Sequence, residues 1–187
     1  KFVVADMPFL TFRKGINVAM DAVEKLMQAG ASAVKLENIE GHEDVVSHIV
    51  KSGVPVMGHL GLTPQSIHQL GGFKVQGKTG EAAKKIIEDS LKLQDLGCFS
   101  LVLECVPVSV AEEITQSLKI PTIGIGAGAV TDGQVLVLYD LLGLQNEFSP
   151  KFLRRFLDSG ELSSAAIESY CNAVREKSFP NAKESYL

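Results

Sequence analysis

Short apolar runs and longer amphipathic stretches alternate along most of this 187-residue chain. Runs rich in Val, Ile and Leu predict buried strands at residues 2–5, 33–36, 55–58, 99–103, 121–125 and 134–138. The stretches between them have helical apolar spacing and predict helices at residues 18–29, 44–51, 81–96 and 110–118. Alternating strands and helices indicate parallel βαβ units. Six such units fit an open doubly wound sheet or most of a (β/α)8 barrel, and periodicity does not choose between them.

The alternation stops after Asp140. Residues 150–157 and 163–176 predict two further helices, and residues 178–187 form a polar tail without periodicity. No linker or low-complexity segment divides the chain, so we expect a single domain over residues 1–187. The first predicted strand already includes residue 2, so we also expect further strands to precede it in the functional protein.

Composition and charge exclude several classes of protein. The net charge of −4 and the pI of about 5.6 argue against a nucleic-acid surface or a basic membrane-binding helix. No apolar run approaches the length of a membrane span, and the first run is too short for a signal peptide. The three cysteines lack metal-ligand spacing, which is typical of reduced thiols in a cytoplasmic protein.

Ionisable residues stand where four successive predicted strands end. They are Asp6, Lys35, Glu37, His59 and Glu104. The carboxyl ends of parallel strands form the ligand crevice of α/β proteins, and a charged group buried there needs a partner or a metal. One such residue could be accidental, but five of them predict a functional site.

Two of the acids have oxygen ligands suited to a divalent cation. Asp6 and Glu37 offer hard carboxylate oxygens of the kind that Mg²⁺ prefers. Lys35 and Glu37 are two residues apart and therefore point to the same side of their strand. Structural alternatives remain open, because Asp6 could cap a turn before Met7 and the Lys35–Glu37 pair could be a plain ion pair.

His59 and Glu104 are candidates for acid–base chemistry. Glu104 follows an apolar strand, where a carboxylate fits the role of a general base. The alternative for Glu104 is a buried acid paired to Lys or Arg. His59 is either a hydrogen-bonding member of the same site or a satisfied core histidine.

The glycine run from Gly124 to Gly128 resembles a dinucleotide-binding fingerprint only weakly. The fingerprint also needs an acid about 20 residues later, at the end of a second strand, and Glu147 does not lie in a strand-like segment. We expect the glycines to allow close approach of the backbone to a substrate or to the floor of a barrel instead.

Seven segments together resemble the ketopantoate hydroxymethyltransferase family over nearly the whole chain. They are VADMPF at 4–9, AVKLE at 33–37, GHLGLTPQ at 58–65, QLGGFKVQGK at 69–78, LVLECVP at 101–107, IGIGAG at 123–128 and TDGQVLV at 131–137. The resemblance implies a (β/α)8 TIM-type barrel of which the chain carries strands three to eight and the C-terminal helices. The family's first two strands, which bring an Asp-Ser pair to the site, have no counterpart here.

The same resemblance implies an activity and roles for the five residues. The family transfers a hydroxymethyl group from 5,10-methylenetetrahydrofolate to 3-methyl-2-oxobutanoate, giving 2-dehydropantoate for pantothenate biosynthesis, through an enolate stabilised by Mg²⁺. By resemblance, Asp6 and Glu37 are metal ligands, Asp6, Lys35 and His59 belong to the substrate pocket, and Glu104 is the catalytic base. The family is cytoplasmic and forms a homo-oligomer, a decamer, with no nucleic-acid or membrane partner.

Two other readings compete with this one. The phosphoenolpyruvate mutase and isocitrate lyase group shares the barrel type and the chelation of a keto acid. Its members typically carry a Cys-Gly-His loop, whereas neither Cys98 nor Cys105 is followed by Gly-His. The second alternative is a barrel without catalytic activity that serves a structural or binding role, against which the complete set of five site residues argues.

Overall fold

The computed structural model describes residues 1–145 and 149–186. Their contacts fall into two compact units, Lys1–Val135 and Leu136–Leu187, which are taken separately below. The single domain expected over residues 1–187 stays a prediction. Glu147, considered above for a dinucleotide site, lies outside the described residues.

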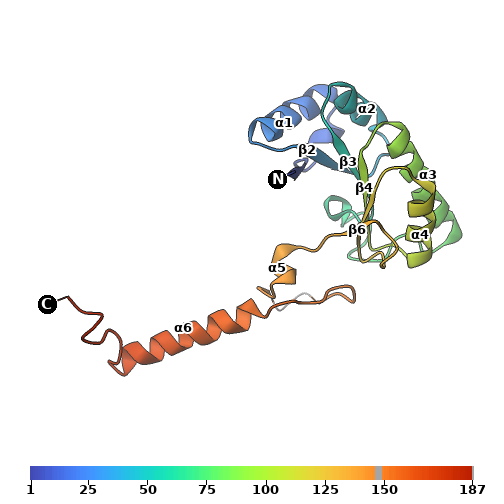
Figure 1. The fold of residues 1–187 in the computed structure, drawn as a ribbon. Helices are drawn as coiled ribbons and strands as arrows, with labels where there is room; N and C mark the ends of the chain where they lie inside the picture. The colour runs from blue at the N-terminus through green and yellow to red at the C-terminus, as the bar shows by residue number, and fades with distance from the viewer. Residues whose placement is uncertain (146–148, 187) are drawn as a thin grey trace. The chain divides into compact units, whose positions relative to one another are not determined.

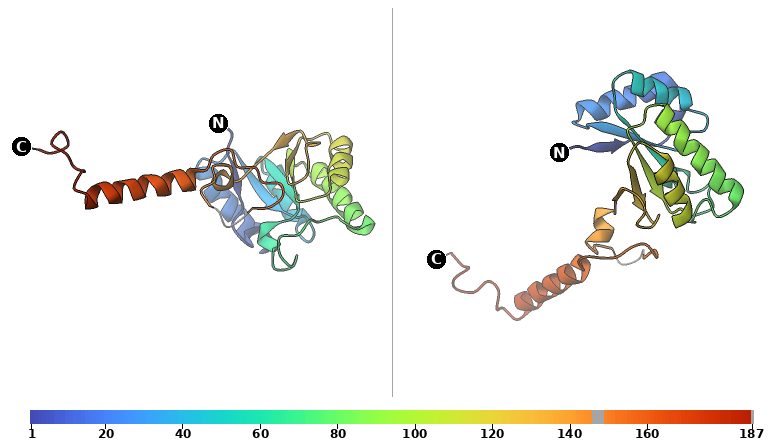
Figure 2. Two further views of the ribbon diagram at one scale, coloured as in Figure 1. Left: turned by 90° about the horizontal axis from the view of Figure 1, so that it is seen from below. Right: turned by 45° about the vertical axis from the view of Figure 1, so that its right-hand side comes forward.

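The first unit is built on a curled sheet of six parallel strands (Figures 1 and 2). The strands lie in sequence order and are β1 (Val4–Asp6), β2 (Ala33–Glu37), β3 (Val56–Gly61), β4 (Ser100–Glu104), β5 (Thr122–Ile125) and β6 (Gly133–Gln134). The predicted α/β class is therefore confirmed. Among the described strands β1 and β6 form the two edges and do not pair with each other, so a closed eight-stranded barrel is not formed by these residues.

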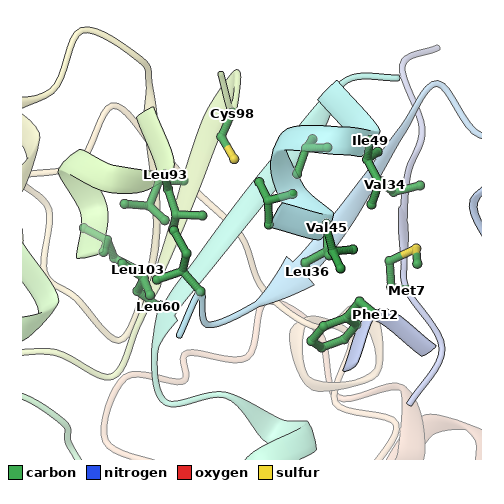
Figure 3. Close-up of a cluster of buried hydrophobic side chains, with 14 of the residues drawn as sticks. Met7, Phe12, Val34, Leu36, Val45, Ile49, Leu60, Leu93, Cys98 and Leu103 are labelled. Carbon is green, nitrogen blue, oxygen red and sulfur yellow. The ribbon is translucent and has the colours of Figure 1, made fainter. Parts of the chain in front are cut away.

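Four helices cover one face of this sheet. They are α1 (Ile16–Gln28), α2 (Glu43–Lys51), α3 (Gly80–Asp95) and α4 (Val108–Ser117), and two short 3₁₀ turns, η1 (Thr11–Arg13) and η2 (Pro64–Ser66), follow β1 and β3. All four are amphipathic, and their apolar sides join the strands in one core (Figure 3). At the start of α3, the Thr79 hydroxyl accepts a hydrogen bond from the Ala82 N–H at 3.2 Å and so caps the helix.

Strand β2 shows how the sheet separates core from site. Val34 and Leu36 belong to the core under the helices, whereas Lys35 and Glu37 point to the opposite face. The predicted common orientation of Lys35 and Glu37 is thus confirmed. The free face of the sheet carries the polar side chains, because the other face is filled by apolar contacts.

The second unit contains the helices α5 (Leu138–Leu141) and α6 (Ser159–Arg175). Helix α6 confirms the helix predicted at residues 163–176, although it begins four residues earlier. The strand predicted at 134–138 is wrong beyond its first residues. Pairing with β5 ends at the Val135 N–H, which donates to the Gly124 carbonyl, and the chain then turns into α5.

The helix predicted at residues 150–157 is also wrong. The Leu153 N–H donates to the Pro150 carbonyl in a turn, and the Phe156 N–H donates to the carbonyl of Leu141 at the end of α5. One group thus bonds within a single turn and the other bonds to α5, and neither continues a helix, which explains the difference. None of the helices in the described part of the chain is long and apolar enough to cross a membrane.

Candidate functional site

Strand register brings the five predicted residues to one edge of the sheet. Asp6 is paired with Lys35 and Glu37 with His59, while Glu104 is paired with Gly61, two residues beyond His59. Paired residues of parallel strands point to the same face. All five side chains therefore lie on the face that carries no helix.

Four of these side chains form a continuous line of contacts across the strands. Lys35 Nζ lies 2.5 Å from Asp6 Oδ1 and 3.3 Å from His59 Nδ1, and His59 Nε2 lies 3.1 Å from Glu104 Oε2. Because a lysine ammonium only donates, His59 Nδ1 accepts and the proton of a neutral ring lies on Nε2. The Nε2–Glu104 contact is close but not aligned as a hydrogen bond, so buried Nε2 makes none to the described residues.

These contacts differ from the structural alternatives that the sequence left open. Lys35 pairs with Asp6 and not with Glu37, and the partner of Glu104 is His59 and not Lys or Arg. His59 is buried but is not fully satisfied by its neighbours. The geometry therefore resembles a reactive site more than a set of separate structural ion pairs.

Glu37 is the most buried acid of the group, with 6% of its surface exposed. Burial raises the pKa of its carboxyl, and the charge of His59, the Gln65 N–H and Lys35 oppose this rise. The Gln65 N–H donates to Oε2 at 2.9 Å, and Oε1 lies 4.0 Å from His59 Nδ1. The negative charge of nearby Asp6 raises the Glu37 pKa further, which shows that the two carboxylates repel each other.

Asp6 and Glu37 are the residues of this group whose carboxylate oxygens could hold a divalent cation. Their charges interact across adjacent strand ends, Glu37 is buried, and Asp6 is mostly exposed, so a cation could reach the pair and would relieve their repulsion. Within residues 1–145 and 149–186, no group of three or more His, Cys, Asp and Glu side chains is arranged to hold a metal. Two carboxylates alone would therefore leave the other positions around such an ion to further ligands.

The backbone turns sharply directly after Glu37 and Glu104. Asn38, which follows Glu37, has a φ of 60°, and Cys105, which follows Glu104, has a φ of 49°. Left-handed backbone is uncommon for residues other than glycine and tends to cluster at functional sites. Gly61 permits the same turn on β3, because a Cβ there would lie 2.2 Å from the Glu104 carbonyl oxygen.

Residues that support Glu37 were not found by sequence reasoning. Gln65 bonds Glu37 through its backbone and donates from its side-chain amide to the Met7 carbonyl at 3.0 Å. Asn38 donates to the hydroxyl of buried Thr63 at 3.2 Å. One signal was available, because Thr63-Pro64-Gln65 marks the start of a helical turn, where backbone N–H groups are free to bind a carboxylate.

The glycine run approaches the chain's own side chains and not an open site. A Cβ on Gly124 would lie 2.6 Å from the hydroxyl oxygen of Thr131 and 3.1 Å from the Gln134 amide nitrogen. The Gln134 side chain donates both to that hydroxyl and to the Gly128 carbonyl. A close approach is therefore present at Gly124, but to the β5–β6 connection, and the expected approach to a substrate or to a barrel floor stays a prediction.

Two solved structures share the fold of this chain. A phosphonopyruvate hydrolase in complex with oxalate and Mg²⁺ aligns with 98% of this chain and 66% of its own, with a TM-score of 0.53 and 11% identity. A phosphoenolpyruvate phosphomutase from Streptomyces platensis subsp. rosaceus aligns with 94% of this chain and 62% of its own, with a TM-score of 0.52 and 11% identity. At such identity the likeness shows the fold alone, a curled parallel α/β sheet like part of these barrels.

Sequence relatives give the family. Residues 1–182 match the family described as ketopantoate hydroxymethyltransferase, and the chain belongs to it. The 3-methyl-2-oxobutanoate hydroxymethyltransferase of Bdellovibrio bacteriovorus is 59% identical over 100% of this chain and 71% of its own length. Those of Francisella tularensis subsp. novicida and Coxiella burnetii are 52% and 56% identical, over 70% and 68% of their own lengths.

Proposed function

We propose that this chain carries the enolate-forming site of a hydroxymethyl transfer from 5,10-methylenetetrahydrofolate to 3-methyl-2-oxobutanoate. The product is 2-dehydropantoate, for the pantothenate pathway. The observation that carries the proposal is the line of contacts from Asp6 through Lys35 and His59 to Glu104 on one face of the sheet. The family membership supports the choice of substrates.

Each residue has a step that its position supports. Glu104, partly exposed beside His59, removes the proton from C3 of the keto acid. The Lys35 ammonium adds positive charge where negative charge builds on the carbonyl oxygen. His59 is held between Lys35 and Glu104 and orients the base. Water releases the one-carbon unit from the donor as formaldehyde, with tetrahydrofolate as the other product. The enolate carbon then attacks this formaldehyde and the new alkoxide takes up a proton, so no covalent bond to the enzyme is required.

The proposal includes a divalent cation, Mg²⁺ or a similar ion. Asp6 and Glu37 would hold it, and when bound it supplies charge that stabilises the enolate and a chelation point for the keto acid. Before any substrate binds, Lys35 balances the charge of Asp6 and the Gln65 N–H supports Glu37. The remaining parts of the proposal, a cytoplasmic location and a homo-oligomer of ten subunits, rest on resemblance to the family.

Exchange of the C3 proton tests the proposed base. In the protein with Mg²⁺ and 3-methyl-2-oxobutanoate deuterated at C3, but without folate, NMR should show loss of deuterium to solvent. Glu104→Gln should slow this exchange by roughly 100-fold or more, because a general base contributes about 10²–10⁴-fold. Its affinity for the keto acid should remain. The matched control is Glu112→Gln on the exposed surface of α4, which should exchange like the parent.

Two results would count against the proposal. Unimpaired exchange in Glu104→Gln would remove Glu104 from the role of base. Absence of exchange in the parent, under conditions where the keto acid binds, would mean that the site does not form an enolate.

A further inference from the structure

A second hollow lies beside the carboxylate site on the first unit. Its volume is about 290 Å³, and it is formed by the segment after β1 and the segment around η2. Its lining includes Phe9, Phe12, Arg13, Gln65 and His68. None of the site residues from Asp6 to Glu104 lines it, so it is a separate space.

Gln65 connects this hollow to the site. Its side chain lines the hollow and donates to the Met7 carbonyl, while its backbone N–H donates to Glu37 at 2.9 Å. A molecule in the hollow therefore lies one residue away from a proposed metal ligand.

The lining has the chemistry of a site for a flat ring with an acidic tail. Phe12 is buried in the core cluster and forms a fixed wall, and Phe9 is 62% exposed and free to cover a ring. The Arg13 guanidinium lies 5.5 Å from the centre of the Phe12 ring, where it can stack or bind a carboxylate. Gln65 and the neighbouring Gln69 offer amides to the edge of a ring, and the lining includes no acidic residue.

The wall is supported from behind by a buried histidine. The ring of His42 packs against Phe12 with centroids 5.0 Å apart, and His42 is itself 1% exposed. Its Nδ1 bonds the Glu40 carbonyl at 3.2 Å, which fixes the ring. The hollow is therefore partly pre-formed, as small-molecule sites usually are.

We propose that this hollow binds the ring system of the one-carbon donor, a reduced folate, with the donor's glutamate carboxylates directed to Arg13. The volume, about 290 Å³, lies just below the range for whole small-molecule sites, about 300–1,000 Å³, which suits one bicyclic ring and leaves the tail outside. This inference rests on the proposed function, since it names the place of the second substrate.

Binding of two probes tests the assignment. Tetrahydrofolate carries ring and tail, whereas 6-methyltetrahydropterin carries the ring alone, and calorimetry gives Kd for both. Phe9→Ala should weaken both probes about 5- to 10-fold, because it removes ring contact. Arg13→Gln should weaken tetrahydrofolate about 5- to 10-fold and leave the pterin within about twofold, because it removes the partner of the tail. The control Lys14→Gln, next to Arg13 but outside the lining, should bind both like the parent.

The outcomes separate this proposal from the proposed function. Unchanged Kd values in Phe9→Ala and Arg13→Gln, with parent-like circular dichroism, would overturn the placement of the donor. If the parent exchanges the C3 deuterium but does not bind tetrahydrofolate, the placement is wrong and the enolate site stands. If the variants lose folate binding but the parent never exchanges the deuterium, the folate site stands and the enolate proposal is wrong.

Discussion

The two units of the chain contain amphipathic helices that differ strongly in how much of their surface is buried. Helix α1 buries Ala19, Ala22 and Val23 against its neighbours, whereas α6 buries none of its seventeen residues. Large apolar side chains of α6, such as Ile167 at 63% and Tyr170 at 56% exposure, remain in solvent. Of the described residues in the second unit, only Asp140 and Gly143 are buried.

The difference teaches that apolar periodicity predicts a helix but not its burial. In α1–α4 each apolar stripe meets a parallel strand that follows or precedes it closely in the chain, and burial stabilises both elements. Within the second unit, α6 is anchored at its start by the Ser159 and Gly160 N–H groups, which donate to the Leu142 and Gly143 carbonyls, and near its end by packing of Tyr170 on Phe179. None of its residues is buried, so its apolar stripe contributes little. The proposed site depends on the first kind of element, since a rigid core holds the strand ends in place.

The difference in burial between the two units should be largest in the reactivity of their thiols. Burial raises the pKa of Cys98 to about 12, and burial together with the charge of Glu104 raises that of Cys105 to about 11, while Cys171 is half-exposed on α6. Since only the thiolate reacts, Ellman's reagent at pH 8 should label Cys171 at least about 100-fold faster than Cys98. The variant Cys171→Ser should remove the fast phase. Equal labelling rates would mean that the first unit opens as readily as the second.

Truncation of apolar side chains should separate the units in stability. Leu103 is fully buried in the core, so Leu103→Ala should lower the free energy of unfolding by about 2–5 kcal/mol. The matched change Ile167→Ala on α6 should cost no more than about 0.5 kcal/mol, because the side chain is exposed. Urea unfolding followed by circular dichroism measures both. A large cost at Ile167 would reveal a partner for α6 in solution.

The smallest expected effect concerns pH and lies within the first unit. Burial, and secondarily the positive charge of Arg13, lower the pKa of His42 below its ordinary 6.5, against weaker effects of the Glu40 and Asn38 carbonyls and of the Glu43 charge. As pH falls below 6.5, unfolded His42 takes up a proton and folded His42 does not. Stability should therefore fall, with a slope of at most about 1.4 kcal/mol per pH unit.

Replacement of this histidine should flatten that slope. His42→Phe keeps the ring against Phe12 but cannot be protonated, so the unfolding free energy should depend less on pH between 5 and about 6.5. The exposed His48 of α2 provides the control, since His48→Gln should leave the slope unchanged. If the unfolding free energy of His42→Phe fell with pH as steeply as that of the parent, other groups would be responsible for the loss of stability at acidic pH.

Most elements of the first unit could be predicted because each strand is covered on one face by helices that follow it. The predicted strand at 33–36, for example, is found as Ala33–Glu37, and the helix predicted at 44–51 as Glu43–Lys51. The wrong predictions concern segments that are not covered by helices in this way. Strand β6 pairs on one side only and stops at Gln134. In the segment 150–157, Phe156 bonds to the end of α5, a contact that no local pattern could reveal.

The sequence was enough to predict which residues belong to the site, but not which of them contact each other. Residues at strand ends could be found from the sequence, because parallel strands present their carboxyl ends together. Which of them touch depends on register and rotamer, so the pairing of Lys35 with Asp6 and His59 required coordinates. The part played by Gln65 depends on how the segment after β3 folds back, which has no periodic signature.

The left-handed turns at Asn38 and Cys105 have a consequence for engineering. A glycine would adopt φ values of 60° and 49° without strain, so Asn38→Gly and Cys105→Gly offer themselves as easy gains in thermostability. Each turn, however, directly follows an acid whose direction matters, and a glycine would loosen the hinge behind it. A screen for heat resistance alone would therefore select against the accuracy of Glu37 and Glu104, and a useful library leaves both turns untouched.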